Sequence, residues 1–366
     1  MPLRVIMHVD LDYFYAQCEE NANPNIRGKP VVVCVYSGRT KESGVVSTSN
    51  YLARKYGVRA GIPISRAKKL LESVDATFLP MNRTYYEEVS DRIMEILRAH
   101  GDAYEKTGID EAYLDVSLQT NLSFDSASES ALEIKREVLS QEHISCSIGI
   151  APNKVLAKIA SDYAKPDGLT IVKPGDVSPF LSPMPVGKIP GVGRKIEEQL
   201  AKLNVSTVAE LSSLNPNTLI ETFGKNLGGY LYRASRGEDE EPVREREQQT
   251  QFSRIATLKQ NTREVQEILP VLTDLVESVA AKMEESGMTG KSVAIIAILT
   301  DLSIHSKSKM LERPTSRRSI VQAAAKELIE EFLRSTPDAI LRRVGVRVSN
   351  LVKQTGQTDI SKFLDA

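Results

Sequence analysis

Short apolar runs alternate with amphipathic stretches along the first half of the chain. Residues 3–9 form an apolar run typical of a buried strand, and residues 85–100 repeat apolar side chains at helical spacing. Further along, the pattern predicts a hairpin over 103–116, a helix over 128–140 and a strand over 144–150. Strand, helix, hairpin, helix, strand is the ferredoxin-like order. It predicts an α+β fold in which an antiparallel sheet carries helices on one face.

The pattern changes after residue 174, where prolines and glycines mark a domain boundary. Ile189-Pro190-Gly191-Val192-Gly193 then leads into an amphipathic helix, which is typical of a helix-hairpin-helix element. Glycines in such a turn let backbone N–H groups approach a DNA phosphate at the start of the next helix. A Pro-Gly-x-Gly turn without DNA is the alternative. The candidate DNA contacts are Gly191, Gly193, Arg194 and Lys195, and Phe223-Gly224-Lys225 is a weaker second copy.

The last third of the chain combines a charged stretch with a compact repeating pattern. Residues 235–249 are poor in apolar side chains, which predicts an exposed linker, and residues 252–349 follow the order strand, helix, two strands, helix, strand. Residues 262–287 hold six acidic and two basic side chains, whereas residues 342–353 hold four basic and no acidic ones. Period-2 geometry puts Arg343 and Arg347 on one strand face, and likewise gives His305, Lys307 and Lys309 a common face. A basic sheet backed by acidic helices favours binding to nucleic acid over a merely solvated surface.

Composition narrows the class of protein. The 366 residues are 41% hydrophobic and 26% charged, which is ordinary for a globular protein of two or more domains. Because 47 Lys and Arg oppose 48 Asp and Glu, a polyanion site must arise from segregated charge. Three cysteines without metal-ligand spacing indicate buried thiols in a reducing compartment. No stretch approaches the ~20 apolar residues of a membrane span, and no basic-plus-apolar leader precedes Leu3, so we expect a cytoplasmic protein without membrane contact.

Two acidic pairs carry the candidate chemistry. Asp110 and Glu111 lie at the turn of the predicted hairpin, and Asp10 and Asp12 close the first strand. The ferredoxin-like order places that strand beside the hairpin, so Asp10, Asp110 and Glu111 can converge despite their separation along the chain. The alternatives are a solvated acidic turn for Asp110 and Glu111, and an N-cap of the following helix for Asp12.

Carboxylates near lysines, followed by two nucleic-acid modules, predict phosphoryl or nucleotidyl transfer. Lys154, Lys158 and Lys165 fall on or near the polar side of a helix over 153–164, although each alone is equally typical of an ordinary surface lysine. Mg²⁺ prefers oxygen ligands and binds through few carboxylates plus substrate phosphates. Two such ions about 4 Å apart activate a sugar hydroxyl and stabilise the leaving pyrophosphate. We therefore expect two Mg²⁺ ions, with Mn²⁺ as an alternative.

Four ordered motifs carry a family resemblance. They are D-L-D-Y-F-Y at 10–15, V-S-T-S-N-Y-L-A-R at 46–54, G-I-D-E-A-Y-L-D at 108–115 and N-K-V-L-A-K-I-A-S-D-Y-A-K-P-D-G at 153–168. With these motifs the chain resembles the Y-family translesion DNA polymerases, most closely the archaeal DNA polymerase IV type, over essentially all of its length. The resemblance implies a template-directed, distributive, low-fidelity DNA polymerase that has no proofreading exonuclease and copies damaged DNA.

The resemblance also implies roles for individual residues. Asp10, Asp110, Glu111 and the Leu11 carbonyl would hold two Mg²⁺ ions, and Tyr15 would pack against the deoxyribose and exclude a 2′-hydroxyl. The incoming triphosphate would be bound by Tyr13, Thr48, Tyr51, Arg54 and Lys165. The nascent base pair would be covered loosely, because the covering side chains are small, by Gly44, Val45, Val46 and Ser47.

The implied domains are a palm (1–12 and 81–168), fingers (13–80), a thumb (169–236), a linker (237–249), a little finger (250–352) and a flexible tail (353–366). The tail matches the motif of clients of the replicative sliding clamp, of the proliferating cell nuclear antigen type, through Gln357, Ile360, Phe363 and Leu364. The other partners of the expected monomer are primer–template DNA and deoxynucleoside triphosphates.

A nucleotidyl cyclase would share the palm and its metals, and a non-catalytic DNA-binding or clamp-bound scaffold is a third reading. The cyclase leaves the DNA modules unexplained, and the scaffold leaves the carboxylates unexplained.

Overall fold

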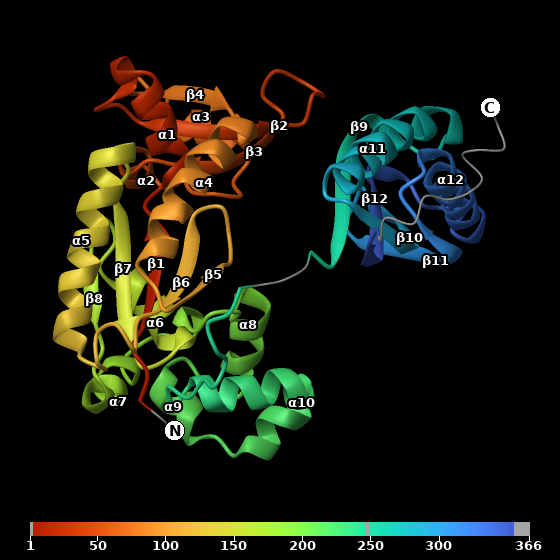
Figure 1. The fold of residues 1–366 in the computed structure, drawn as a ribbon. Coiled ribbons are helices and arrows are strands. Elements are labelled where there is room, and N and C mark those ends of the chain that lie inside the picture. The colour runs from red at the N-terminus through yellow and green to blue at the C-terminus, as the bar shows by residue number, and fades with distance from the viewer. Residues whose placement is uncertain (1–2, 246–248, 355–366) are drawn as a thin grey trace. The chain divides into compact units, whose positions relative to one another are not determined.

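The computed structural model describes residues 3–245 and 249–354 (Figure 1). Two compact units divide the chain. One holds residues 1–34, 46–62 and 66–246, and the other holds residues 35–45, 63–65 and 247–366. The predicted clamp-binding residues lie outside the described residues: Gln357, Ile360, Phe363 and Leu364.

A five-stranded sheet forms the centre of the first unit, with the order β5-β6-β1-β7-β8. Its central strand, β1 (Ile6–Leu11), pairs antiparallel with both β6 (Glu111–Asp115) and β7 (Cys146–Ala151). β5 (Ala103–Lys106) pairs antiparallel with β6, and β8 (Leu169–Ile171) runs parallel to β7. The predicted ferredoxin-like order is therefore present, and it places the end of β1 beside the β5–β6 turn.

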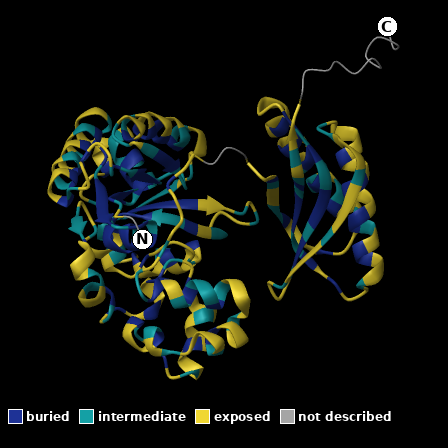
Figure 2. Cartoon of the chain, turned by 60° about the horizontal axis from the view of Figure 1, so that its bottom comes forward, coloured by how far each residue is buried: buried dark blue, intermediate teal, exposed yellow. Residues whose placement is uncertain are grey.

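The two helices of the ferredoxin-like order lie on one face of this sheet, as predicted, and a further helix covers the opposite face. Helices α4 (Arg83–Ala99) and α5 (Phe124–Glu142) pack with Met7 and Val9 of β1. Helix α6 (Lys154–Tyr163) packs with Ile6, which points to the opposite face. Ile6 and His8 of β1 are fully buried on the α6 face, so α6 supplies a cover that the ferredoxin-like order does not include. Figure 2 shows these strands buried beneath exposed helix surfaces.

A smaller three-stranded sheet has the order β3-β2-β4 (Figure 1). Its strands are β2 (Val31–Tyr36), β3 (Gly44–Ser49) and β4 (Thr77–Pro80). Around them are α1 (Phe14–Ala22), the 3-10 turn η1 (Pro24–Ile26), α2 (Tyr51–Lys55) and α3 (Ile64–Leu70). Gly44 is required where β3 begins, because an added Cβ would lie 2.2 Å from the Val35 carbonyl oxygen at a φ of +148°.

Residues 174–234 are helical. They form η2 (Pro174–Asp176), α7 (Val177–Leu181), η3 (Val186–Lys188), α8 (Arg194–Lys202), α9 (Val208–Ser213) and α10 (Pro216–Ala234). Gly193 is the N-cap of α8, and Gly191 has a φ of +84°, which a turn of this kind requires. Gly224, with a φ of 79°, interrupts α10, so the weaker glycine turn also separates two helical segments.

The predicted linker begins as a docked segment. The Asn153 side chain donates to the Gly237 carbonyl at 2.7 Å, and the Arg4 guanidinium donates to the Asp239 carbonyl at 2.7 Å. Val243 is buried. Residues 237–245 therefore bind to the first unit through main-chain acceptors and one apolar anchor, signals that the charged composition of the stretch did not reveal.

The second unit is a four-stranded antiparallel sheet with the order β11-β10-β12-β9. Its strands are β9 (Gln251–Thr262), β10 (Met288–Leu299), β11 (Ile304–Thr315) and β12 (Leu341–Lys353). Helices α11 (Val265–Glu285) and α12 (Arg318–Ser335) pack against one face, where Val344, Val346 and Val348 are buried. No helix among residues 3–245 and 249–354 is long and apolar enough to cross a membrane.

Candidate active site

The two acidic stretches meet where β1 and β6 end. Asp10 lies directly opposite Glu111 in the strand register, and the Leu11 N–H donates to the Asp110 carbonyl at 2.8 Å. The β5–β6 turn is closed by N–H groups of Thr107 and Gly108, which both donate to the Glu111 carbonyl at 3.2 Å. Neighbouring strands thus bring Asp10, Asp110 and Glu111 together, as the ferredoxin-like order predicted.

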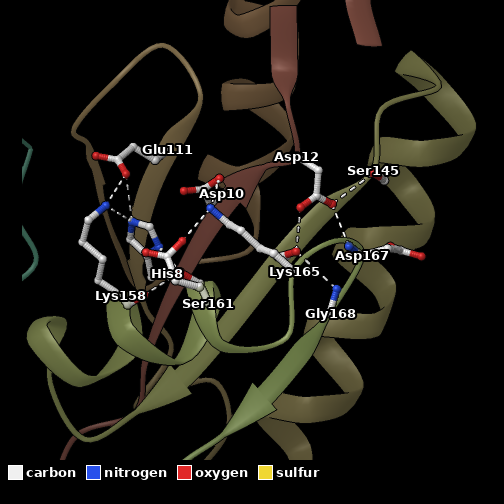
Figure 3. Close-up of polar contacts among 12 residues, drawn as sticks. His8, Asp10, Asp12, Glu111, Ser145, Lys158, Ser161, Lys165, Asp167 and Gly168 are labelled. Atoms are coloured by element: carbon white, nitrogen blue, oxygen red, sulfur yellow. Dashed lines mark hydrogen bonds and ion pairs between the residues drawn. The ribbon is translucent and has the colours of Figure 1, made fainter. Parts of the chain in front are cut away.

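Asp10 pairs with a lysine from the end of α6. The Lys165 ammonium lies 2.7 Å from an Asp10 carboxylate oxygen and 2.7 Å from Asp162 (Figure 3). Burial nevertheless raises the pKa of Asp10 to about 6, because Lys165 offsets only part of the lost hydration. Burial and the adjacent Glu111 carboxylate also raise the pKa of Asp110. The positive charge near Asp10 and Asp110 therefore does not offset the cost of burying them as ionised carboxylates.

Glu111 has a different environment, which includes a histidine that the sequence patterns did not single out. The His8 Nε2 lies 3.4 Å from a Glu111 oxygen, and Lys158 also pairs with that carboxylate. Hydrogen bonding from His8, reinforced by Lys158, holds the pKa of Glu111 well below its usual range. Burial lowers the pKa of His8 to about 4, so the ring is a neutral hydrogen-bonding partner at neutral pH. Its Nδ1 lies 2.7 Å from the Ser161 hydroxyl (Figure 3).

The three lysines of the α6 region have separate environments. Lys158 and Lys165 contact Glu111 and Asp10 respectively, whereas Lys154 pairs with the buried Glu105 at 2.6 Å. Spacing along the helix could not distinguish them, because all three fell near one polar side. The sequence did not predict the contacts of His8 either. Period-2 alternation does indicate that His8 and Asp10 share one face of the strand.

Divalent cations fit this donor set chemically. No group of three His, Cys, Asp or Glu side chains within residues 3–245 and 249–354 closes around a common point. Asp10 and Glu111 instead pair with Lys165 and Lys158. A hard cation such as Mg²⁺ takes oxygen ligands and needs only one or two carboxylates when substrate phosphates supply the rest. The buried Asp10 and Asp110, whose pKa values are raised, would gain from such a cation, and the ionised Glu111 beside them can supply a further oxygen ligand together with a bound triphosphate.

A cavity of about 420 Å³ opens beside the carboxylates. It is lined by both strand ends, the start of α1, and β3 with α2. Its walls include every residue for which the resemblance implied a nucleotide contact: Tyr13, Tyr15, Thr48, Tyr51, Arg54 and Lys165. The cavity is also lined by Asp10, Leu11 and Asp110 at its acidic end, and by Ser47 of the predicted base-pair cover. The other residues of that predicted cover do not line it: Gly44, Val45 and Val46.

Aromatic contacts fix the cavity wall. Tyr13 meets Tyr51 edge-on at 5.3 Å between ring centroids, and the Arg54 guanidinium lies 4.6 Å from the Tyr51 ring centroid. Tyr15 stacks on the buried Tyr86 at 4.5 Å. Tyr13 has a φ of 36°, a left-handed conformation that costs energy for an aromatic residue, which is common where a site must be held in shape.

The glycine turn before α8 presents a candidate DNA-binding surface. Gly193 begins α8 without a side-chain cap, so its first backbone N–H groups are free of such a partner. The Arg194 side chain is 90% exposed and pairs with Glu198 at 2.8 Å, and Lys195 follows it on the exposed helix. The turn therefore combines backbone donors with basic side chains, as a phosphate site requires.

In the second unit the structure separates the basic residues that the sequence grouped. Arg343 and Arg347 pair with Ile298 and Ala294 on the sheet face without helices. Lys307 and Lys309 pair with Ile295 and Val293, which are buried under the helices. The two lysines form ion pairs of 2.6 Å with Glu331 and Glu327 of α12. They do not belong to one surface with the arginines, because the register puts odd-numbered residues of β11 on the helix side.

Comparisons with known proteins agree with this geometry. The model of the impB/mucB/samB family matches residues 9–162, the model of its C-terminal domain matches 249–361, and a model described as the DNA polymerase-iota thumb domain matches 187–239. DNA polymerase IV of Nitrosopumilus maritimus is 43% identical over 99% of this chain and 100% of its own length. DNA polymerase IV of Saccharolobus solfataricus is 40% identical over 99% of each chain.

Solved structures give the same result. A Y-family DNA polymerase chimera of Dbh and Dpo4 has a TM-score of 0.89 and 39% identity, covering 95% of this chain and 99% of that one. An insertion ternary complex of Dbh DNA polymerase has a TM-score of 0.68, 39% identity and the same coverage. The chain therefore belongs to the Y-family of DNA polymerases, within the DNA polymerase IV group, and is a DNA-directed DNA polymerase.

Proposed function

We propose that this polymerase extends primers distributively and with low fidelity, by two-metal nucleotidyl transfer, and uses this activity to copy damaged templates. The observation that carries the proposal is the cavity of about 420 Å³, because it joins two strand-end carboxylates, Asp10 and Asp110, to a wall of hydroxyl and cationic side chains. A nucleoside triphosphate fits such a site, because its polyanionic triphosphate, esterified to a sugar, can be bound by the cationic and hydroxyl side chains. Template, primer and deoxynucleoside triphosphate are thus the proposed substrates of a monomeric enzyme.

The cavity wall can bind the triphosphate by charge and by hydrogen bonding. Arg54 and Lys165 supply positive charge, and the hydroxyl groups of Thr48, Tyr13 and Tyr51 supply donors. Burial raises the pKa of Tyr13 to about 12, so its phenol stays protonated and can donate at neutral pH. Together these groups would orient the α-phosphate toward the carboxylates, which is most of what phosphoryl transfer asks of a protein.

The carboxylates supply the other half of the reaction. Divalent cations held by Asp10, Asp110 and Glu111, proposed as two Mg²⁺ ions with Mn²⁺ as an alternative, would lower the pKa of the primer 3′-hydroxyl and neutralise the leaving pyrophosphate. His8 and Lys158 hold the Glu111 carboxylate ionised and oriented. Asp10 pairs with Lys165 and lies opposite Glu111 in the strand register, so it links a proposed triphosphate contact to the other carboxylates.

Low fidelity is supported by the size of the lining side chains. Ser47, Thr48 and Ala60 are small and line the cavity, so they would contact a base pair over little area. A loose enclosure discriminates weakly between correct and incorrect shapes, and it leaves room for a damaged base. We propose the glycine turn before α8 and the open face of the second unit's sheet as the surfaces that hold the duplex.

Primer extension tests the proposal. The wild-type protein, with Mg²⁺ and each deoxynucleotide separately, should add the base that the template specifies, both on an intact template and opposite an abasic site. Asp110→Ala should lower the rate by about 100-fold or more, because it removes a metal ligand. Asp115→Asn, at the far end of β6, is the matched control and should stay near wild type. Undiminished extension by Asp110→Ala would contradict the metal assignment. Arrest of the wild-type protein opposite the abasic site would contradict the bypass role.

A further inference from the structure

Asp12 is a buried carboxylate that lies outside the nucleotide cavity. Its exposed fraction is 1%, and it follows β1 directly. An N-cap of α1 was the alternative raised by the sequence, and the structure shows that it is wrong. The N-cap of α1 is Tyr13, and no side chain caps that helix. A buried carboxylate is costly unless several donors satisfy it, so its actual partners indicate what it does.

The Asp12 side chain accepts three hydrogen bonds from two other parts of the chain (Figure 3). One carboxylate oxygen accepts from the Ser147 hydroxyl at 2.8 Å. The other accepts from the Ser145 hydroxyl at 3.0 Å and from the Asp167 backbone N–H at 2.8 Å. Ser147 in turn accepts from the Gly168 N–H at 3.2 Å. Asp12 and β7 therefore hold the loop that follows Lys165.

The held loop contains a residue in an unfavourable backbone conformation. Asp167, two residues after Lys165, has a φ of 54°, which a non-glycine residue adopts at a cost unless neighbouring contacts support it. Its side chain accepts from Lys135 at 2.6 Å. The Asp12 carboxylate supplies the support on the main-chain side, and the position of Lys165 depends on this loop.

The main chain of Asp12 also anchors the turn into α1. Its N–H donates to the Ser145 carbonyl at 3.0 Å, and its carbonyl accepts from the Gln17 side chain, which itself accepts from the Ser145 N–H at 2.9 Å. Tyr13 and Tyr15 lie in the segment between Asp12 and Gln17. Two parts of the cavity wall, this turn and Lys165, thus share one buried anchor.

We propose that Asp12 is a positioning residue that fixes the Lys165 ammonium at the nucleotide cavity through the Asp167 N–H. The role rests on the proposed function of Lys165 as a triphosphate contact. It differs from general structural support, because its loss should weaken nucleotide binding through Lys165 and leave primer–template binding nearly unchanged.

A double-mutant cycle tests the role. The dissociation constant of the correct deoxynucleoside triphosphate is measured with a chain-terminated primer, so that no reaction occurs, for wild type, Asp12→Ala, Lys165→Ala and the double variant. We expect Asp12→Ala to weaken nucleotide binding about 10-fold, which is about 1.4 kcal/mol. In the Lys165→Ala background the same change should cost less than about twofold, because coupled residues are not additive. Primer–template affinity should change less than about twofold in all variants.

Two further variants keep the result independent of folding. Asp12→Ala leaves three donors without an acceptor and lowers the melting temperature, so the cycle is repeated with Asp12→Asn, which keeps one acceptor oxygen. Asp12→Asn should recover part of the lost affinity, with the remaining loss again confined to the background that retains Lys165. Asp115→Asn, which alters a carboxylate that accepts the Ser117 N–H at 3.0 Å, should leave nucleotide affinity unchanged.

Three outcomes would overturn the proposal. Equal losses with and without Lys165, or an equal loss of primer–template affinity, would show that Asp12 supports the fold in general. If Lys165→Ala itself left nucleotide affinity unchanged, the role of Lys165 would be wrong and the positioning role would fail with it. Failure of the wild-type protein to extend primers would instead contradict the proposed function, which separates the two claims.

Discussion

Asp10 shows how a functional side chain can oppose stability. Burial raises its pKa to about 6, so keeping Asp10 ionised at neutral pH lowers the free energy of unfolding. The folded protein binds more protons than the unfolded chain between the ordinary pKa of 3.8 and about 6, so its stability falls as the pH rises through that window. A neutral isostere would not lose stability in this way. The residue is retained for its charge and lowers the stability of the fold.

Asp10→Asn should therefore stabilise the metal-free protein while it abolishes primer extension. We expect a gain of about 1–2 kcal/mol in the free energy of unfolding at pH 7.5, measured by denaturant titration with a chelator present. The gain should shrink as the pH falls from 6 toward 4, because the wild-type carboxyl is then neutral as well. A loss of stability at pH 7.5 would show instead that the Lys165 ion pair outweighs the cost of burial.

Tyr15 packs against a neighbouring ring and is also the residue proposed to exclude ribonucleotides. Its ring stacks on Tyr86 at 4.5 Å and also lines the nucleotide cavity, so the two roles are compatible. Tyr15→Ala should raise the ratio of ribonucleotide to deoxyribonucleotide incorporation by about 10-fold or more, since the ring would no longer exclude a 2′-hydroxyl. Tyr15→Phe keeps the ring and should leave the ratio near wild type. An unchanged ratio in the alanine variant would rule out the steric role.

At the scale of elements, strand register decides which basic residues can meet DNA. The Nε atoms of Arg343 and Arg347 are buried on the open face of the sheet and have no hydrogen-bond partner within the residues that the structure describes. Lys307 and Lys309 are on the helix side and paired with glutamates. The register thus divides the four basic residues into two groups: the arginines are on the open face, and the lysines pair with glutamates on the helix side.

The salt dependence of DNA binding can distinguish these groups. Arg343→Ala and Arg347→Ala should each weaken primer–template binding and reduce the slope of log K against log salt by about one per lost phosphate contact. Lys307→Ala and Lys309→Ala, the matched controls, should leave the slope unchanged, because they lose only exposed ion pairs. The reverse pattern would place the DNA on the helix side of the sheet.

Long elements with strong periodicity were predictable, and short ones were not. The pattern over 85–100 appears as α4 (Arg83–Ala99), and the predicted helix over 153–164 appears as α6. No sequence pattern predicted β4 (Thr77–Pro80), because its four residues become a strand only by pairing with β2. Short strands depend on a partner distant in sequence, whereas a long amphipathic helix forms most of its contacts locally.

At the scale of the whole molecule, we propose recruitment to a sliding clamp through a segment outside the described residues. The motif of Gln357, Ile360, Phe363 and Leu364 supports the proposal of binding to a sliding clamp. A distributive polymerase gains processivity when it is tethered, because tethering raises its effective concentration at the primer end. The clamp and the catalytic cavity should therefore contribute separately.

Deleting residues 357–366 should leave extension by the polymerase alone within about twofold and abolish its stimulation by the clamp, because only the tether is lost. Phe363→Ala with Leu364→Ala should reproduce the effect without shortening the chain. Primer extension with and without loaded clamp makes the measurement. Stimulation that survives both changes would place the clamp contact elsewhere on the protein.

Sequence by itself determined the order of elements, the family and the identity of the acidic residues. Asp10, Asp110 and Glu111 could be found because carboxylates at adjacent strand ends follow from connectivity, which is written in the chain. Only the tertiary structure decided that His8 and Lys158 contact Glu111, that Asp12 holds the Lys165 loop, and that Lys307 and Lys309 face α12. Period-2 alternation tells which residues of a strand share a face. Which face receives the helices, and which distant side chain lies against a given residue, depends on pairing and packing between segments far apart in sequence.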